Sequence, residues 1–496
     1  MQSFQNPFGR YTGSDRIRSV PLLLTLLVII AFTAFIIGKM GLIATFGLIA
    51  LPFAFAYLYF LFRSPLIGLY TAFIFAFILL GLSRYIPGIP IGLGMDGILV
   101  LTLLSFIFKN FYTKVNWKPV KKDITVLALI WFSYYLLEVL NPEARSVNAW
   151  FTGRVVALYM LLLIPLVLLL VDNIKKLDNI FLIWGIFSLL ATAKGIMQNV
   201  IGLDPWEHIW LSIPGNYSTH MLFGKLRVFS FLSDAGQFGA NQAYSGVVAF
   251  IYAGSQKNIK KKVFFYVVAI MGFYGMMISG TRGSISVPLV GFVVYLVLNK
   301  NIRILIPGFI ILVGLFVFFK YTTIAQGNSQ VARMRSAFDP NNASLQVRLE
   351  NQRKLKSYLA SRPFGGGVGH AGGKARKFLP NAFLSNVPTD SWYVMIWAEM
   401  GIVGLVLHLS ILFYVVIKSS YMIIFRIRDP IHRIKMTALT SGMMGIMAAS
   451  YGNGVLGQMP TGIYIYTSMA LMLNTDFFDI EKEKNGSEKI TTSNES

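Results

Sequence analysis

The chain has 496 residues, of which 55% are hydrophobic and only 13% charged, so it lacks the charged surface that a soluble protein of this length needs. It has no cysteine, five histidines and 21 acidic residues, which excludes disulfides and a thiol nucleophile and leaves few ligands for a metal, so we expect no metal and no cofactor. The net charge of +23 would suit nucleic acid, but membrane proteins concentrate Lys and Arg in cytoplasmic loops, and we expect no nucleic-acid partner.

Apolar blocks of about 17 to 25 residues recur along the chain, and each is long enough to cross a bilayer as a helix. They predict an all-α polytopic membrane protein with about 14 transmembrane helices, within a range of 12–14. The expected spans cover 20–37, 41–62, 65–84, 91–108, 123–140, 154–171, 179–200, 236–254, 262–280, 283–299, 302–320, 391–417, 435–452 and 458–474. The remaining segments are a cytoplasmic tail at 1–19, an outer segment near 201–235, a large outer loop at 321–390 and a disordered cytoplasmic tail at 475–496.

The distribution of Lys and Arg predicts which side each loop faces. If the N-terminus is inside and the spans alternate, the inside segments hold 25 of the 44 basic residues. The short outside loops before the eighth span hold few of them. This asymmetry predicts that both termini are cytoplasmic and that the loop 321–390 faces outward. That loop contains ten Lys or Arg and three acidic residues, which suits an anionic ligand such as a lipid diphosphate.

The clearest local motif stands at the outer junction of the ninth and tenth expected spans and reads Ser279-Gly280-Thr281-Arg282-Gly283-Ser284. An arginine at this depth is costly unless it is paired or faces a polar cavity. One interpretation is that Arg282 binds a phosphate through its planar guanidinium, which flanking glycines allow to approach closely. The other is an arginine that extends to the outer interface without a ligand.

A second arginine, Arg227, precedes a polar helix start that contains Asp234, Gln237, Asn241 and Gln242. This cluster at a membrane entrance is consistent with a sugar site. It is equally consistent with a helix cap followed by ordinary hydrogen bonds between helices.

The large loop carries two further features. The segment around Arg348 predicts an amphipathic helix that runs to Ser361, and the turn behind it, Pro363-Phe364-Gly365-Gly366-Gly367-Val368-Gly369-His370, is rich in glycine. Such a turn can present backbone N–H groups to an anion, although glycine-rich stretches are usually flexible loops.

The last feature opens the twelfth expected span, where Asp390 and Ser391 are followed by Glu399 and Gly401. Asp390 stands where a helix N-cap is expected, which by itself would explain the residue. Glu399 lies about two turns deeper, near membrane depth, and so must have a partner or line a cavity.

Together, in this order, the four motifs resemble the O-antigen ligase and O-antigen polymerase superfamily of polytopic membrane glycosyltransferases. The resemblance covers about residues 225–410 and implies a GT-C-like helical fold with short helices in the large periplasmic loop. It implies that Arg227 and Arg282 bind the lipid diphosphate, aided by Arg348. The motif of the family also places Asp390 where the ligases have a catalytic histidine and Ser391 where an asparagine follows it, a departure that favours a polymerase-like member.

The resemblance also implies the chemistry and the partners. A glycan on undecaprenyl diphosphate is the donor, a glycan or lipid hydroxyl is the acceptor, and the reaction inverts the anomeric carbon without a metal. Asp390, Arg282 and Arg227 form the expected catalytic set. The expected substrate-binding residues are Arg348, Gly367, Gly369, His370, Glu399 and Ser391. The protein would lie in the bacterial inner membrane with a periplasmic site, beside a chain-length regulator or other polysaccharide assembly proteins.

Two other classes of function remain open from the sequence. A flippase for lipid-linked oligosaccharides or another polysaccharide transporter often has this many spans, although such proteins usually show internal repeats and short loops. A lipid receptor or assembly scaffold would use the same basic loop without chemistry. Within the transferase class, a lipid A-core ligase and a protein O-oligosaccharyltransferase are the alternatives to a polymerase.

Overall fold

A computed structural model describes residues 20–40, 42–86, 91–222, 224–299, 302–327, 329–339 and 343–474. The expected cytoplasmic tails, 1–19 and 475–496, lie outside the described residues. Regular structure in the described ranges is almost entirely helical, and its one sheet is a pair of two-residue antiparallel strands, β1 (Met221–Leu222) and β2 (Lys225–Leu226). The all-α prediction is therefore confirmed.

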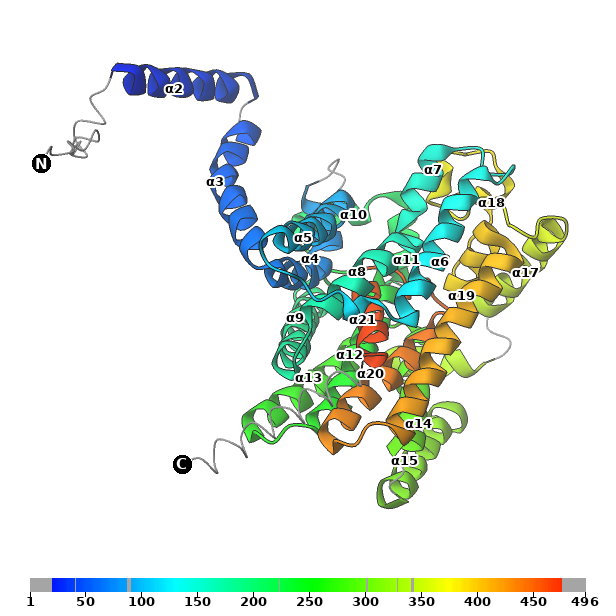
Figure 1. Cartoon of the computed structure of the whole chain (residues 1–496). Coiled ribbons are helices and arrows are strands. Elements are labelled where there is room, and N and C mark those ends of the chain that lie inside the picture. Colours follow the sequence, from blue (N-terminus) through cyan, green and yellow to red (C-terminus); the bar gives the residue numbers. More distant parts are fainter. Residues whose placement is uncertain are drawn as a thin grey trace, which may run out of the picture. The chain divides into compact units, whose positions relative to one another are not determined.

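The chain divides into two compact units, Met1–Ser64 and Pro65–Ser496. The first contains two apolar helices, α2 (Val20–Met40) and α3 (Leu42–Arg63). The second contains all the other elements (Figure 1). Its helices are α4 (Pro65–Tyr85), α5 (Gly92–Tyr112), η1 (Lys118–Val120), α6 (Asp123–Leu137), η2 (Glu138–Leu140), α7 (Val147–Thr152), η3 (Gly153–Val156), α8 (Leu158–Leu170), α9 (Ile174–Val200), α10 (Pro205–Leu211), α11 (Pro214–His220), α12 (Ala235–Ala253), α13 (Ile259–Ile278), η4 (Arg282–Ile285), α14 (Ser286–Asn299), α15 (Ile302–Tyr321), α16 (Ser329–Arg335), η5 (Ser336–Phe338), α17 (Ala343–Leu359), η6 (Ala375–Lys377), α18 (Phe383–Asn386), α19 (Trp392–Phe425), α20 (Pro430–Ala449) and α21 (Thr461–Met472).

Each apolar block in the sequence forms a helix, because a backbone in lipid must satisfy its own hydrogen bonds. Within the described ranges, eight helical segments are long and apolar enough to cross a membrane. They are Pro65–Tyr85, Gly92–Tyr112, Asp123–Leu140, Val147–Leu170, Ile174–Val200, Ile259–Ile278, Arg282–Asn299 and Trp392–Phe425. The chain is thus a polytopic helical membrane protein, and the count of fourteen spans stays a prediction.

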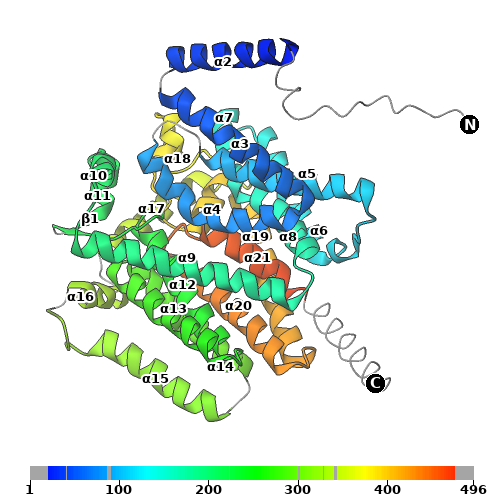
Figure 2. The same ribbon diagram turned by 90° about the vertical axis from the view of Figure 1, so that its left-hand side faces the viewer.

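The helix α12 lies in the interior of the second unit. It contacts α9, α13, α14 and α20, and Figure 2 shows α9, α12 and α13 side by side. Asp234 caps it by accepting a hydrogen bond from the Gln237 N–H at 2.9 Å, and the side chains of Gln237 and Asn241 donate to Thr461 in α21. This polar row is therefore a cap followed by hydrogen bonds between helices, the structural alternative left open by the sequence.

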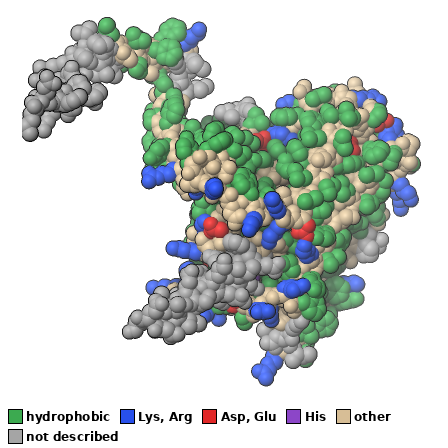
Figure 3. All heavy atoms as spheres, in the orientation of Figure 1, with side chains coloured by type: hydrophobic (Ala, Val, Ile, Leu, Met, Phe, Trp, Pro, Cys, Tyr) green, Lys and Arg blue, Asp and Glu red, His purple; other side chains and the backbone are tan. Residues whose placement is uncertain are grey.

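The surface of the second unit matches a bilayer environment along its helices. Large apolar side chains such as Ile270, Ile417 and Phe425 are each about two-thirds exposed. Figure 3 shows hydrophobic side chains over much of one face, with Lys and Arg at the upper right, where α17 and α18 lie, and also across its middle and lower part. Exposed apolar surface on this scale is expected of helices that face lipid.

The loop between α15 and α19 contains the short helices α16, α17 and α18, which agrees with the expected architecture. A small apolar cluster, separate from the main core, fixes α17 to the rest of this segment and to α19. Its buried members are Leu355, Leu359, Ala371, Leu384, Val387 and Ala398. This packing fixes the helix that carries Arg348.

Candidate functional site: an arginine-lined pocket

Four arginines from separate parts of the chain line one pocket of about 410 Å³. Arg227 follows β2, Arg282 begins η4, Arg333 lies in α16 and Arg348 lies in α17. Among the described residues, Asp339 is the one carboxylate in the lining. The pocket therefore carries a large excess of positive charge and is suited to an anion. It brings together the three arginines predicted from the sequence.

Arg227 is held in place by two hydrogen bonds. Its Nη1 donates to the Thr219 carbonyl and its Nη2 to the Thr281 hydroxyl, both at 3.0 Å, while its Nε is buried without a partner. Burial lowers the pKa of Arg227, and the charges of Arg282 and Arg348 lower it further, whereas Asp234 raises it. The position of the guanidinium is thus fixed, and one of its donors has no acceptor among the described residues.

The turn that contains Gly280, Thr281, Arg282 and Gly283 lines the pocket, and its two glycines allow it to lie close to its neighbours. Gly280 has a φ of +58°, and a Cβ at this position would lie 3.3 Å from Cδ of Arg333. A Cβ on Gly283 would lie 2.3 Å from Nδ2 of Asn453, which is too close for a side chain. Both glycines therefore have a steric role in bringing the turn against α16 and the segment after α20.

Arg282 and Arg333 reach the pocket from different elements, η4 and α16. Arg282 donates to the Ser336 hydroxyl at 3.2 Å, which ties η4 to η5 in the large loop. Burial, followed by the charges of Arg227 and Arg282, lowers the pKa of Arg333 to about 10. Arg333 therefore remains protonated at neutral pH, and an anion between the arginines would relieve their mutual repulsion.

Arg348 links the pocket to Asp390. Its Nε lies 3.5 Å from Oδ2 of Asp390, whose side chain is 52% exposed. The N-cap of α19 is Ser391, whose hydroxyl accepts from the Val394 N–H, so the expectation that Asp390 caps this helix was wrong. The cap lies one residue later in the chain, which leaves the Asp390 carboxylate available at the surface.

The glycine-rich turn lies outside the pocket and packs against a break in α19. Gly401 has a φ of +66°, and the N–H groups of Gly366 and Gly367 donate to the carbonyls of Ala398 and Glu399, each at 2.9 Å. A Cβ on Gly401 would lie 2.0 Å from the Pro363 carbonyl oxygen. The turn and the break therefore form one joint between the loop and α19.

The same turn also contacts a buried carboxylate of the protein itself, that of Glu399. The Glu399 side chain is buried, and the backbone N–H groups of Gly369 and Ala371 donate to its carboxylate. Gly367 and Gly369 have φ values of +94° and +76°, and a Cβ on Gly369 would lie 2.0 Å from the Ala149 carbonyl oxygen. The structure thus places Glu399 and both glycines in a packed joint, away from the arginines.

His370 also has a place in this joint. Its Nε2 accepts from the Ser146 N–H at 3.0 Å, and its Nδ1 lies 2.9 Å from the Val368 carbonyl oxygen. These contacts require a neutral imidazole with its proton on Nδ1. Burial lowers its pKa, although hydrogen bonds to Val368 and Gly367 raise it. Both ring nitrogens are engaged, and the pocket lining does not include His370.

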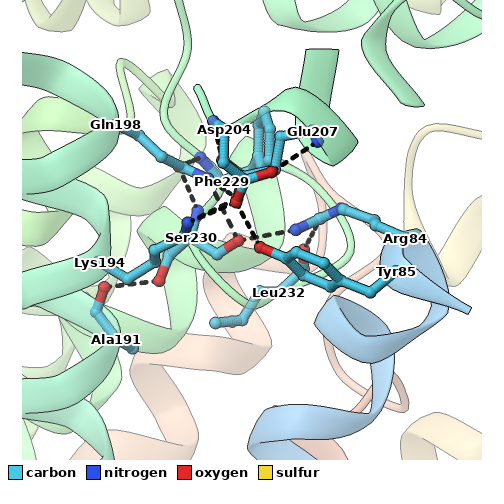
Figure 4. A network of polar contacts seen from close by, with 10 residues as sticks. All are labelled: Arg84, Tyr85, Ala191, Lys194, Gln198, Asp204, Glu207, Phe229, Ser230 and Leu232. Atoms are coloured by element: carbon cyan, nitrogen blue, oxygen red, sulfur yellow. Dashed lines mark hydrogen bonds and ion pairs between the residues drawn. The ribbon is translucent and has the colours of Figure 1, made fainter. Parts of the chain in front are cut away.

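A polar network around Arg84, at the end of α4, holds the segment that follows Arg227 (Figure 4). Arg84 Nη1 donates to the Ser230 carbonyl at 2.7 Å. Its guanidinium lies 4.5 Å from the Trp210 ring centre and 4.4 Å from that of Phe229. These contacts fix the chain just beyond Arg227.

Carboxylates complete that network. Lys194 lies 3.0 Å from Asp204 and 3.2 Å from Glu207, and the Tyr85 hydroxyl donates to Asp204 at 2.5 Å. Gln198 donates to Glu207 at 2.7 Å (Figure 4). Lys194 thus pairs with two carboxylates, Arg84 with backbone carbonyls, and the network has its own counter-charges.

Sequence reasoning missed Arg333, and with it Tyr451 and Asn453, which line the pocket from the segment after α20. Arg333 looked like any basic residue of a loop with ten of them. The sequence signal for Asn453 was a polar residue between glycines, Gly452 and Gly454, at the outer end of an expected span. Neither pattern indicates which residues meet in space.

Comparison with known proteins identifies two similarities. Residues 266–409 match a family model described as O-Antigen ligase, a region that includes Arg282, Arg333, Arg348 and Asp390. An O-antigen polymerase from Salmonella muenchen is 24% identical over 294 residues, which cover 55% of this chain and 68% of that protein.

Proposed function

Because the chain belongs to the O-antigen ligase and O-antigen polymerase superfamily, we propose that it is a glycosyltransferase that uses a glycan on undecaprenyl diphosphate as its donor. The single observation that carries this proposal is the pocket lined by four arginines and one carboxylate. Several guanidinium donors at close range match the charge and the oxygen atoms of a diphosphate. The pocket offers such a set of donors.

The proposed step is an in-line displacement at the anomeric carbon. An acceptor hydroxyl attacks this carbon, the bond from carbon to the diphosphate oxygen breaks, and the electron pair leaves with the diphosphate. Arg227, Arg282 and Arg333 stabilise the charge that develops on that oxygen. Asp390 accepts the hydroxyl proton, since its carboxylate is exposed and lies beside the pocket through Arg348. Displacement in line inverts the anomeric carbon.

Polymerisation is the form of transfer that we favour, with another lipid-linked repeat as acceptor. Two observations support it. The relative from Salmonella muenchen is named a polymerase, and this chain has Asp390 and Ser391 where the ligase motif has histidine and asparagine. The distribution of basic residues in the sequence supports a site on the periplasmic side of the inner membrane.

The test is reconstitution of the purified protein in lipid nanodiscs with lipid-linked oligosaccharide. The wild type should release undecaprenyl diphosphate and lengthen the glycan. Arg282→Ala should lower the release rate by about 10²–10³-fold, the effect of removing one donor that stabilises a developing oxyanion. Asp390→Asn should lower transfer while the affinity for inorganic pyrophosphate remains, because the arginines are intact.

The matched control is Arg353→Ala, since Arg353 lies on the same helix as Arg348 but is exposed and does not line the arginine pocket. It should retain wild-type activity. Full transfer by Arg282→Ala would refute the assignment of the pocket. In liposomes, movement of the lipid across the bilayer without bond cleavage would identify a transporter, and neither movement nor cleavage would identify a scaffold.

A further inference from the structure

A second depression lies beside the arginine pocket, between α17 and the start of α19. Its lining includes Asn351, Asp390 and Ser391, and it shares Arg348 with the arginine pocket. Its volume is about 10 Å³, which is room for one group of the size of a water molecule. A single hydroxyl group fits that space.

Asn351 is the unusual residue of this depression. Its side chain is 9% exposed, and its Nδ2 is buried without a hydrogen-bond partner. A buried amide donor without an acceptor is destabilising, and native proteins rarely retain one without a reason. An oxygen atom of a bound ligand would satisfy the donor.

The face of α17 explains why the two cavities share one wall. Arg348, Asn351, Leu355 and Leu359 follow the helical repeat and lie on one side of the helix. Leu355 and Leu359 pack into the small apolar cluster described above, which fixes the rotation of the helix. The polar end of that face therefore presents Arg348 to both cavities and Asn351 to the depression alone.

We propose that this depression binds the acceptor sugar and that Asn351 positions it. Asn351 Nδ2 donates to a hydroxyl oxygen that enters the depression. The neighbouring hydroxyl of the same sugar remains at its exposed rim, where Asp390 accepts the proton as the new bond to the anomeric carbon forms. The diphosphate leaves with its electron pair into the arginine pocket. The ligand class is a neutral sugar with adjacent hydroxyls, and this assignment rests on the proposed transferase function.

The arrangement separates the two substrates by chemistry. The arginine pocket binds charge, and the depression recognises a hydroxyl through one amide and one carboxylate. Because Arg348 contacts Asp390 at 3.5 Å and also lines the arginine pocket, a bound diphosphate competes with Asp390 for the same guanidinium. Binding of the donor would therefore free the carboxylate for the acceptor.

The decisive variant is Asn351→Leu, which keeps the size of the side chain and removes the amide. Since Nδ2 has no partner in the part of the chain that the structure describes, this change should leave the thermal midpoint unchanged or raise it. The assay uses the lipid-linked repeat as donor and the free oligosaccharide repeat, released from lipid by mild acid, as a soluble acceptor. We expect the KM for the free repeat to rise about tenfold, as for the loss of one hydrogen bond to a ligand.

Donor binding provides the internal control. The affinity of Asn351→Leu for inorganic pyrophosphate should stay within about twofold of the wild type, and release of undecaprenyl diphosphate should shift from transfer to hydrolysis. Asn351→Ser, which keeps a donor, should recover part of the acceptor affinity. Lys356→Ala changes an exposed residue of α17 and should match the wild type.

An unchanged KM for the free repeat in Asn351→Leu would overturn the proposal. A parallel loss of pyrophosphate affinity would overturn it as well, because Asn351 would then act through the fold of α17. If Asn351→Leu does not fold, the KM of Asn351→Ser decides the question. If the wild-type protein releases no undecaprenyl diphosphate, the proposed function itself fails, an outcome distinct from failure of the variants.

Discussion

Two cationic clusters in the second unit differ in how their charge is balanced. Near Arg84, Lys194 forms ion pairs with Asp204 and Glu207, and backbone carbonyls accept the hydrogen bonds of Arg84. Burial raises the pKa of Asp204, but hydrogen bonds from Tyr85, the Glu207 backbone and Lys194 outweigh it and lower that pKa to about 2. The arginine pocket has four guanidinium groups and one carboxylate in its lining.

The difference separates a structural cluster from a binding site. A buried charge needs a counter-charge, and the network of Arg84 contains its own. Among the described residues that line the pocket, arginines outnumber carboxylates by four to one, which makes it a candidate site for an anion from outside the protein.

The largest expected effect is on the stability of the Arg84 network. Arg84→Met should destabilise the protein by about 1–3 kcal/mol for each buried carbonyl, at Ser230 and Leu232, that loses its donor. Thermal unfolding in detergent measures this loss. Arg282→Ala should leave the thermal midpoint unchanged or raise it, since it relieves repulsion in the pocket. Equal losses of stability in both variants would erase the distinction between the clusters.

A smaller effect is expected for the affinity of the pocket. Arg333→Gln should weaken binding of inorganic pyrophosphate by about tenfold, in keeping with the loss of a charge-assisted hydrogen bond. Calorimetric titration with inorganic pyrophosphate measures this loss.

Arg335→Gln is the control for that prediction. Arg335 lies on the same helix but donates to the Ile324 carbonyl at 2.6 Å and does not line the pocket. If both variants lose affinity equally, the effect comes from the net charge of the loop and not from contact with the anion.

The smallest expected effect is a loss of stability at acid pH in the joint between the loop and α19, where His370 lies. Burial lowers the pKa of His370 in the folded state, so the unfolded chain binds the proton more readily. Stability from the neutral imidazole is therefore present above the ordinary histidine pKa of about 6.5 and is lost as the pH falls below it. The fraction of molecules in which the loop is open should rise by at most about tenfold for each unit by which the pH falls.

Limited proteolysis of the loop between about pH 7 and pH 5 measures this opening. His370→Gln should show little change across that range, because glutamine does not titrate. A wild-type cleavage rate that is independent of pH would contradict the structural role given to the imidazole.

The sequence predicted the helices well because hydrophobic length is a local property. Every expected span coincides with a helix, even at 91–108, where Gly92, Gly94 and Asp96 interrupt the pattern. It did not predict the break at Gly401, where the predicted span continues without interruption. That break depends on the turn at Pro363 and Gly365, which lies far away in the sequence and packs into it.

The same reasoning explains which site residues were found. Arg227, Arg282 and Arg348 were identified because their motifs resemble those of a known family, and the structure brings them together. Glu399 and His370 were assigned to substrate, but their partners are backbone groups at Gly369, Ala371 and Ser146. Arg333 and Asn351 were missed because their role depends on packing of the large loop against distant helices.

The walls of the arginine pocket are spread along the chain from Arg227 to Asn453. During biosynthesis, residues enter the membrane in order, and contacts between distant segments form last. The pocket is therefore incomplete until α20 and the segment after it have emerged from the ribosome. A nascent or truncated chain that ends before Ala448 would contain every arginine of the cluster and still lack the wall formed by Ala449, Tyr451 and Asn453.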